Sequence, residues 1–118
     1  DIALRSLLRR GGVPAAVCIA TCCHHRCDAA SYVNLPFLEE LGLLAREGDV
    51  ERLASMAGWA VGGRGDVAAR RRLGMMAKRV LDLGRVAWLR DTLELPDAML
   101  VHYIGKEVTP ENIAIIAG

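Results

Sequence analysis

The feature that most constrains the fold is an uninterrupted apolar run over residues 13–23, which follows a Gly-Gly pair. Neighbouring residues of a strand point to opposite faces, so such a run makes both faces apolar. This is typical of a strand that is covered on both sides in an α/β protein. We therefore expect a central strand over residues 14–23. The run is far too short to cross a bilayer, and we expect no membrane association.

The rest of the chain alternates between helical and extended patterns. Apolar spacing predicts helices in four segments: residues 1–10, 35–43, 50–59 and 67–93. Extended patterns predict two further strands, over residues 98–104 and 111–117. This order predicts an α/β fold that forms half of a doubly wound sheet, with an antiparallel strand at its edge and flanking helices.

Composition bears on the domain organisation. The 118 residues are 53% hydrophobic but only 4% aromatic, and the mean hydropathy is +0.24. So apolar a composition suits an interior piece of a larger α/β domain better than a free-standing small protein. We expect residues 1–118 to be one partial domain.

The four cysteines all lie between residues 18 and 27. No distant cysteine is present to close a long loop, so the pattern does not resemble a secreted disulfide framework. We expect a reducing intracellular compartment, which is the cytoplasm, the nucleus or the mitochondrion.

Charge is unevenly distributed, although the net charge is only +1. Residues 39–51 hold five acidic residues and one arginine, whereas residues 64–90 hold eight basic residues and two aspartates. The basic segment is suited to contact phosphates. The alternative is a solvated helix face that pairs with the acidic segment.

Residues 22–27, with the sequence Cys-Cys-His-His-Arg-Cys, have three possible interpretations. One is a structural zinc site, which the contiguous ligands fit poorly because zinc ligands are usually separated by spacers. Another is a cysteine nucleophile activated by a neighbouring histidine. The last is a polar loop at the carboxyl end of a buried strand, where α/β sheets bind ligands.

The polar-loop interpretation assigns chemistry to individual residues. A histidine titrates near neutral pH and can act as a general base. Arg26 can grip a phosphate with two hydrogen bonds. The structural alternative is that the cysteines pack as small core residues while backbone groups satisfy both histidines.

Several stretches resemble one known family. Residues 20–27, followed by Tyr32, look like the signature of the eukaryotic tRNA methyltransferases that 2′-O-methylate the fourth nucleotide of the acceptor stem. Further similarity covers nearly the whole chain, in order, at four places: residues 1–8, 55–61, 78–85 and 108–112.

The resemblance implies a class I Rossmann-like methyltransferase fold that uses S-adenosylmethionine. Residues 14–23, 98–104 and 111–117 would then be strands five to seven, the last of them antiparallel. The family's glycine-rich cofactor loop and acidic ribose-binding residue would precede this chain, so we expect the N-terminal cofactor-binding half to be absent and identify no cofactor-binding residues here. We expect no metal ion.

The resemblance also implies a function, which is methyl transfer to a ribose hydroxyl in the acceptor stem. The expected catalytic-site residues are His24, His25, Arg26, Cys22 and Cys23. The expected contacts to tRNA or another RNA are Arg64, Arg70, Arg71, Arg72, Lys78, Arg79 and Arg85. Such a chain would not be active alone. The alternative is a non-catalytic half-domain that binds RNA or a protein partner in a large assembly, with the partner covering its open sheet edge.

Overall fold

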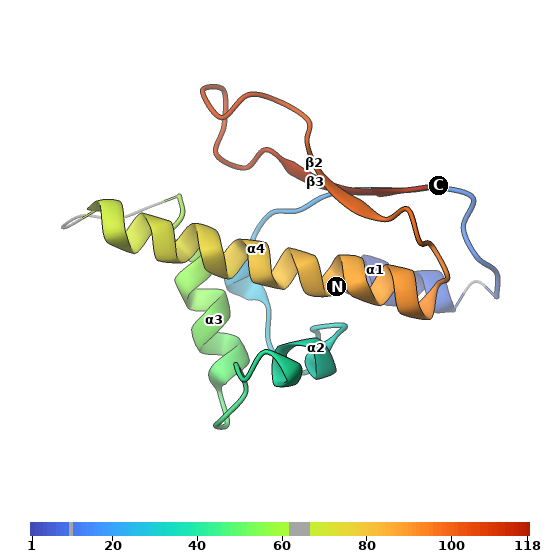
Figure 1. Cartoon of the computed structure of the whole chain (residues 1–118), viewed down its shortest axis with the longest axis horizontal. Helices are drawn as coiled ribbons and strands as arrows, with labels where there is room; N and C mark the ends of the chain where they lie inside the picture. The colour runs from blue at the N-terminus through green and yellow to red at the C-terminus, as the bar shows by residue number, and fades with distance from the viewer. Residues whose placement is uncertain (10, 62–66) are drawn as a thin grey trace.

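The computed structural model describes residues 1–9, 11–61 and 67–118, and it confirms the α/β class. Its elements are, in order, α1 (Ile2–Leu8), β1 (Val17–Ala20), the 3₁₀ turn η1 (His24–Arg26), α2 (Leu35–Glu40), α3 (Asp49–Gly58), α4 (Val67–Thr92), β2 (Met99–His102) and β3 (Ile113–Ala117) (Figure 1). Every predicted helix and strand is present, but the strands are shorter than predicted. None of the described helices combines the length and the apolar character needed to cross a bilayer.

The three strands form one sheet in the order β1-β3-β2. β3 lies in the middle and is antiparallel to both neighbours, with Val17 opposite Ala117 and Met99 opposite Ile116. The predicted antiparallel direction of the last strand is confirmed. Since β1 and β2 both oppose β3, they run in the same direction, and the helical segment between them carries the chain from one edge of the sheet to the other.

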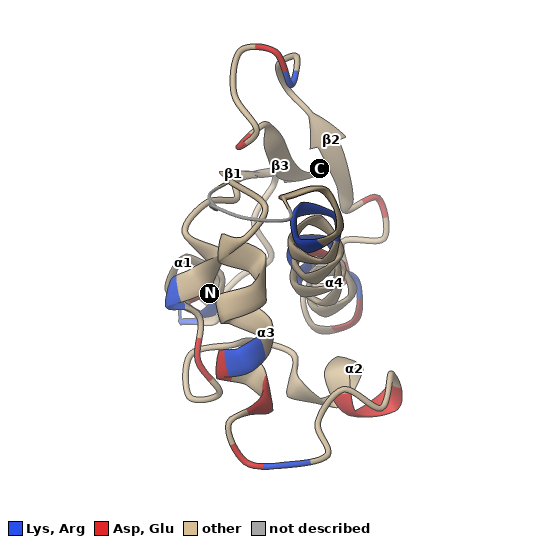
Figure 2. Ribbon diagram, turned by 90° about the vertical axis from the view of Figure 1, so that its left-hand side faces the viewer, with Lys and Arg blue, Asp and Glu red and all other residues tan. Residues whose placement is uncertain are grey.

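The prediction of a central strand covered on both faces is wrong for this chain. β1 is only four residues long and leaves Cys18 and Ala20 exposed, and β3 is its one partner among the described strands. α1 and α4 lie against one face of the sheet, and none of the described helices lies against the other (Figures 1 and 2). An apolar run predicts which residues avoid water, but only the neighbouring elements determine whether a face is covered.

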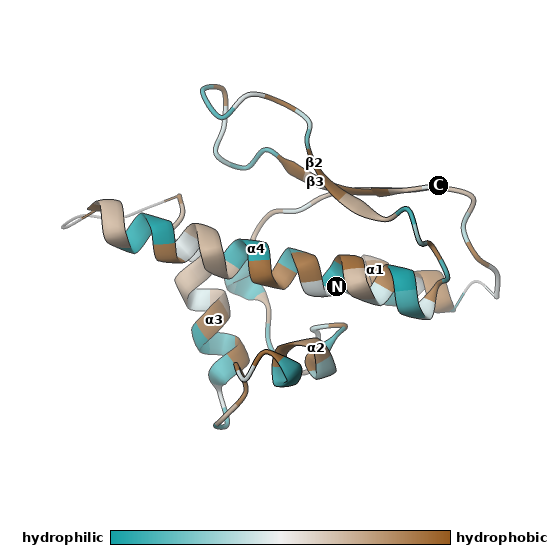
Figure 3. Cartoon of the chain, in the orientation of Figure 1, coloured by the Kyte–Doolittle hydropathy of each residue, from teal (hydrophilic) through white to brown (hydrophobic). Residues whose placement is uncertain are grey.

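α4 contributes to two hydrophobic clusters. In Figure 3 this helix, banded brown and teal, lies between the strands β2 and β3 on one side and the helices α2 and α3 on the other. Toward the sheet, Leu89 and Val86 pack with Ile115 of β3 and Leu4 of α1. Away from the sheet, Ala77 and Leu81 pack in a second cluster whose other buried members are Cys27, Tyr32, Leu38, Val50, Ala54 and Ala57. The long helix therefore holds the sheet and the helical layer together.

α3 and α4 cross at Gly74, which is buried. A Cβ atom at this position would lie 2.8 Å from the carbonyl carbon of Trp59 and 2.9 Å from the carbonyl oxygen of Met56. Both of these are backbone atoms, which give way less easily than a flexible side chain. The glycine thus permits a close approach that fixes the C-terminal end of α3 beside α4.

Candidate functional site

The turn that follows β1 and the segment that leads into β3 lie at the same end of the strands. Because β3 is antiparallel to β1, it begins where β1 ends, and the Thr21 amide extends their pairing by donating to the Ile113 carbonyl at 3.0 Å. Cys23 then takes a left-handed backbone conformation, with φ of 52°, and η1 follows. Residues 22–25 and Glu111 thus line one hollow, and residues 22–26 form a polar loop after the carboxyl end of β1.

The two histidines of η1 lie in different environments. His24 is 3% exposed, and its Nε2 atom lies 2.8 Å from Oδ1 of Asp82 on α4. Its other ring nitrogen, Nδ1, is buried without a hydrogen-bond partner in the described parts of the chain. His25 and Arg26 are exposed. The turn therefore directs one imidazole inward, where it anchors the loop, and leaves the next one accessible to a ligand.

Asp82 is the centre of a buried polar network. Its side chain is fully buried and accepts hydrogen bonds from Thr21 Oγ1 at 3.1 Å and Arg85 Nη1 at 2.8 Å, in addition to its contact with His24. Burial by itself raises the pKa of Asp82, but the hydrogen bond and charge of His24, followed by those of Arg85, outweigh this and lower it. Asp82 is therefore ionised at neutral pH and ties η1 and the end of β1 to α4.

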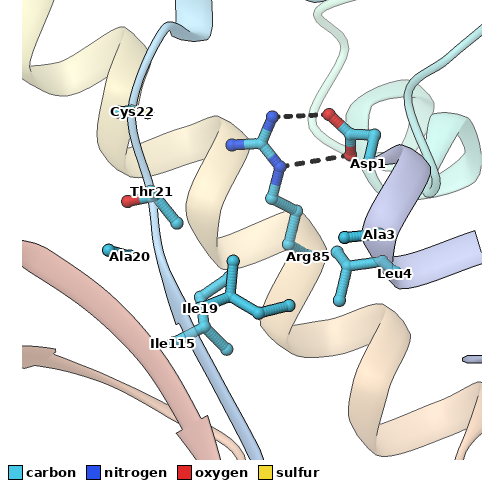
Figure 4. Close-up of a pocket in the computed structure, with 9 residues that line it drawn as sticks. All are labelled: Asp1, Ala3, Leu4, Ile19, Ala20, Thr21, Cys22, Arg85 and Ile115. Carbon is cyan, nitrogen blue, oxygen red and sulfur yellow. Dashed lines mark hydrogen bonds and ion pairs between the residues drawn. The ribbon is translucent and has the colours of Figure 1, made fainter.

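Arg85 extends this network to the start of the chain. Its Nε donates to Oδ1 of Asp1 at 3.1 Å and its Nη2 donates to Oδ2 at 2.6 Å, a bidentate pair seen in Figure 4. Both side chains line a small pocket of about 110 Å³ together with Thr21 and Cys22. The Arg85 guanidinium thus forms ion pairs with two carboxylates, those of Asp1 and Asp82.

A second hollow of about 150 Å³ lies beside η1. It is lined by residues 22–25, by Ala57 and Gly58 at the end of α3, and by Val61 and Glu111. Four of the five predicted catalytic-site residues therefore line one hollow, and Arg26 is the next residue along the chain. Glu111 forms an ion pair with Lys78 of α4 at 2.7 Å.

The surroundings of Cys22 and Cys27 disfavour the nucleophile interpretation for these two residues. Cys22 and Cys23 are free and exposed, and a hydrogen bond with Cys23 raises the pKa of the Cys22 thiol. Burial raises the pKa of Cys27 as well. These two thiols are protonated at neutral pH, whereas nucleophilic cysteines act as thiolates. Within the described ranges, no three His, Cys, Asp or Glu side chains gather where they could hold a metal ion.

The basic residues of α4 fall into two groups. Arg70, Arg71, Arg72 and Arg79 are exposed, and the Arg70 guanidinium lies 4.5 Å from the centre of the Trp59 ring. By contrast, Lys78 and Arg85 are buried, at 6% and 7% exposed, and both form ion pairs. Of the predicted RNA contacts, these two are thus not on the surface, and Arg64 lies outside the described residues.

The alternative in which the basic helix pairs with the acidic segment is not seen in the described structure. Asp49 of the acidic segment pairs with Arg52 of its own helix. No ion pair among the described residues joins the four exposed arginines of α4 to an acidic side chain. In the ribbon of Figure 2, the acidic positions of α2 and α3, coloured red, lie at the end of the view opposite the sheet.

Three residues of the site were not predicted from the sequence: Asp82, Glu111 and Asp1. The signal for Asp82 was available, since it is one of only two acidic residues in the basic segment and lies one helical turn before Arg85. Glu111 and Asp1 lie 33 and 84 residues from their partners, a separation that no local pattern bridges.

The described residues do not fit the whole of S-adenosylmethionine. Sites for molecules of this size usually enclose about 300–1,000 Å³. The two hollows at this edge measure about 110 Å³ and about 150 Å³. No glycine-rich turn between a strand and a helix, which could cradle such a molecule, is found in the described segments.

Sequence comparisons cover the whole chain. The family model described as "Methyltransferase TRM13" matches residues 1–69 and 65–118. Relatives named "tRNA:m(4)X modification enzyme TRM13" are 30% identical over 142 positions in Vanderwaltozyma polyspora, 35% over 141 in Eremothecium gossypii and 27% over 132 in Saccharomyces cerevisiae. These alignments cover 99%, 98% and 86% of this chain but 33%, 30% and 28% of the respective relatives. No solved structure matches the chain.

The chain therefore spans about a third of the length of the curated relatives it matches. The 142 positions aligned with the Vanderwaltozyma protein exceed the 118 residues of this chain, so that relative carries extra residues within the matched region. The two family matches meet at residues 65–69, just where α4 begins. With matches that together span every residue, the resemblance found in the sequence is confirmed, and the chain belongs to the TRM13 methyltransferase family.

Proposed function

We propose that this chain is part of a tRNA 2′-O-methyltransferase, which transfers a methyl group from S-adenosylmethionine to a ribose hydroxyl in the acceptor stem. The observation that carries the proposal is the family match along the entire chain. The accessible His25 and Arg26 at the strand-end edge support it, because α/β sheets bind ligands there. S-adenosylmethionine would be held mainly outside the described residues, since these form no cradle of its size.

The chain's own residues would act on the RNA. Transfer to a ribose 2′-hydroxyl requires that the hydroxyl be positioned and that its proton be taken up. His25 is the accessible imidazole for this proton, while His24 is a positioning residue that holds η1 against Asp82. Arg26, exposed beside His25, would bind a phosphate next to the target nucleotide.

The exposed arginines of α4 would guide the RNA toward this edge. Arg70 lies over Trp59, which directly follows the residue Gly58 that lines the larger hollow. With Arg71, Arg72 and Arg79 it supplies positive charge along one helix. Such contacts to phosphates position a nucleic acid without reading its sequence. Lys78 and Arg85 are not part of the proposed RNA-binding surface, because both are buried and form ion pairs with carboxylates.

The sheet would be completed by strands outside the described residues. β1 and β2 run in the same direction, and none of the described elements pairs with the outer edge of β1 or covers the second face of the sheet (Figure 1). This supports the proposal that the chain forms the C-terminal half of a Rossmann-like methyltransferase domain. The free, exposed cysteines fit the proposed reducing intracellular compartment.

The test is a methyl-transfer assay on the complete protein, using tRNA and methyl-labelled S-adenosylmethionine. Loss of a general base typically slows the chemical step by about 10²–10⁴-fold, and we expect His25→Ala to lower kcat in this range. Arg26→Ala should raise KM for tRNA. His102→Ala is the matched control, since His102 is exposed at the end of β2 and does not line the hollow. Wild-type rates in both site variants would contradict the assignment.

A second candidate is a non-catalytic subunit in which another protein covers the free edge of β1. The edge of β1 that no described strand pairs with favours it. It predicts that the complete protein binds tRNA but transfers no methyl group, and that an unrelated partner protects the amides of β1 from hydrogen exchange.

A further inference from the structure

The larger hollow brings together polar groups from two distant parts of the chain. His25 and the buried His24 come from η1, and Glu111 comes from the segment that leads into β3. Ala57, Gly58 and Val61 form its apolar side. The hollow thus has a polar side and an apolar side.

The position of Glu111 is fixed by several contacts. Lys78, whose side chain is 7% exposed, binds Oε2 of Glu111 at 2.7 Å. The Glu111 amide donates to Thr109 Oγ1 at 3.1 Å, and its carbonyl accepts from the Tyr103 hydroxyl at 2.7 Å. In the described part of the chain, Oε1 of Glu111 has no hydrogen-bond partner. One carboxylate oxygen is thus held by Lys78, and the other retains its accepting capacity.

The chemistry of the hollow favours a hydroxyl over a phosphate. Neither lysine nor arginine lines it, and the free carboxylate oxygen of Glu111 can accept a hydrogen bond but cannot donate one to a phosphate. A carboxylate accepts a hydrogen bond from a hydroxyl, and the apolar side suits the carbon face of a sugar. At about 150 Å³ the hollow is smaller than sites that enclose a small molecule, which measure about 300–1,000 Å³, so it would receive a part of a nucleotide, such as its sugar ring.

We propose that Glu111 binds the target ribose before methyl transfer by accepting a hydrogen bond from its 2′-hydroxyl, and that Lys78 is the positioning residue that holds this carboxylate. The hydroxyl has a single proton, so it turns from Glu111 to His25 when that imidazole takes the proton up. The inference rests on the proposed function and names the group that would recognise its substrate. Within an RNA strand the 3′-oxygen is esterified, so the 2′-hydroxyl is the only ribose hydroxyl that can donate. The same hydroxyl distinguishes RNA from DNA at a given site. Glu111 therefore makes this hollow selective for ribose.

The test measures binding, not catalysis. The complete protein is titrated with two acceptor-stem RNAs that differ only in carrying ribose or 2′-deoxyribose at the target nucleotide, and fluorescence anisotropy gives both dissociation constants. A hydrogen bond to a charged group is worth about tenfold in affinity. We expect the wild type to prefer the ribose form by about tenfold. Glu111→Gln should reduce this preference to about threefold or less, with affinity for the deoxyribose form unchanged.

Glu107→Gln is the matched control, because Glu107 is an exposed acid in the same loop and does not line the hollow. It should keep the wild-type preference. If Glu111→Gln leaves the buried Lys78 uncompensated and prevents folding, the double variant Lys78→Met, Glu111→Gln removes both charges and serves for the same measurement.

A variant at Glu111 that retains the wild-type preference for ribose would overturn this inference alone. Failure of the wild type to bind either RNA would overturn the proposed function and the inference with it. Equal binding of both RNAs by the wild type would also overturn the inference, while the tRNA substrate would stand.

Discussion

The Nε2 atom of His24 lies 2.8 Å from Oδ1 of Asp82, and the two side chains are 2% and 0% exposed. This contact joins the turn after β1 to the middle of the long helix α4. It also separates two neighbouring histidines, because His24 is committed to the interior while His25 stays at the surface. The side chain of His24 thus anchors the turn in the interior, and the side chain of His25 is available to a ligand.

Removing the charge of Asp82 should destabilise the fold. In Asp82→Asn, the amide cannot satisfy the hydrogen bonds from Thr21, His24 and Arg85 together, and the buried Arg85 loses one of its two carboxylates. Breaking a buried charge pair typically costs about 3–5 kcal/mol. Because Asp1 still pairs with Arg85, we expect the loss in the free energy of unfolding to lie near the lower end, at about 3 kcal/mol. Urea denaturation at pH 7 measures it.

Asp91→Asn is the control for this variant, since Asp91 is an exposed acid near the end of the same helix. Surface substitutions of this kind usually change stability by less than about 0.5 kcal/mol. A similarly small change in Asp82→Asn would contradict the role given to the buried network.

The stability of the wild type should fall in acid because of Asp82. Its pKa in the folded chain is lowered below the unfolded value of about 3.9, so the folded state binds this proton less readily than the unfolded state. The stabilisation is therefore complete above about pH 5 and is lost as the pH falls through the folded-state pKa. Unfolding free energies measured from pH 6 to pH 2 should fall more steeply for the wild type than for Asp82→Asn. Parallel curves would show that Asp82 is not responsible.

Gly74→Ala should loosen the packing between α3 and α4. The added methyl group would meet the backbone of Met56, Trp59 and Ala60, so the helices must separate. Overpacking of this kind costs about 1–3 kcal/mol. Gly12→Ala is the control, because a Cβ there has no atom within 4 Å and the backbone φ is not in the left-handed region. Thermal unfolding should show a lower Tm for Gly74→Ala only.

The two groups of basic residues should affect RNA binding differently. Replacing Arg71 and Arg72 with alanine should weaken tRNA binding and reduce the slope of log K against log salt by about 0.9 for each phosphate that is no longer neutralised. The matched control is Arg46→Ala, an exposed arginine in the acidic segment. We expect Lys78→Met to lower stability without changing this slope, because Lys78 faces Glu111 and not solvent. An unchanged slope in the double arginine variant would place the RNA elsewhere.

The sequence predicted the order and type of the elements because these depend on local patterns. The apolar spacing of residues 67–93 corresponds closely to α4 (Val67–Thr92), and the breaker Pro96 lies just beyond it. The strands were predicted at the right places but too long. Their ends depend on where the pairing with β3 stops, which is a property of the partner strand and not of the run itself.

Whether an individual charged side chain is buried or exposed depends on contacts that the sequence does not reveal. Arg71, Lys78 and Arg85 recur every seven residues, a spacing that places their Cα atoms on about the same side of a helix. The structure exposes Arg71 but buries the other two, because Glu111 and Asp1 reach them from distant parts of the chain. The same reason separates His24 from His25, since only the packing of η1 against α4 places Asp82 next to one of them.

The most direct test of the central claim is to map the product of the complete protein. After incubation with tRNA and methyl-labelled S-adenosylmethionine, alkaline hydrolysis leaves intact the phosphodiester that follows a 2′-O-methylated ribose. We predict one protected linkage, at the fourth nucleotide of the acceptor stem, and its loss in His25→Ala. A label found on a base, or no label in tRNA at all, would contradict the account.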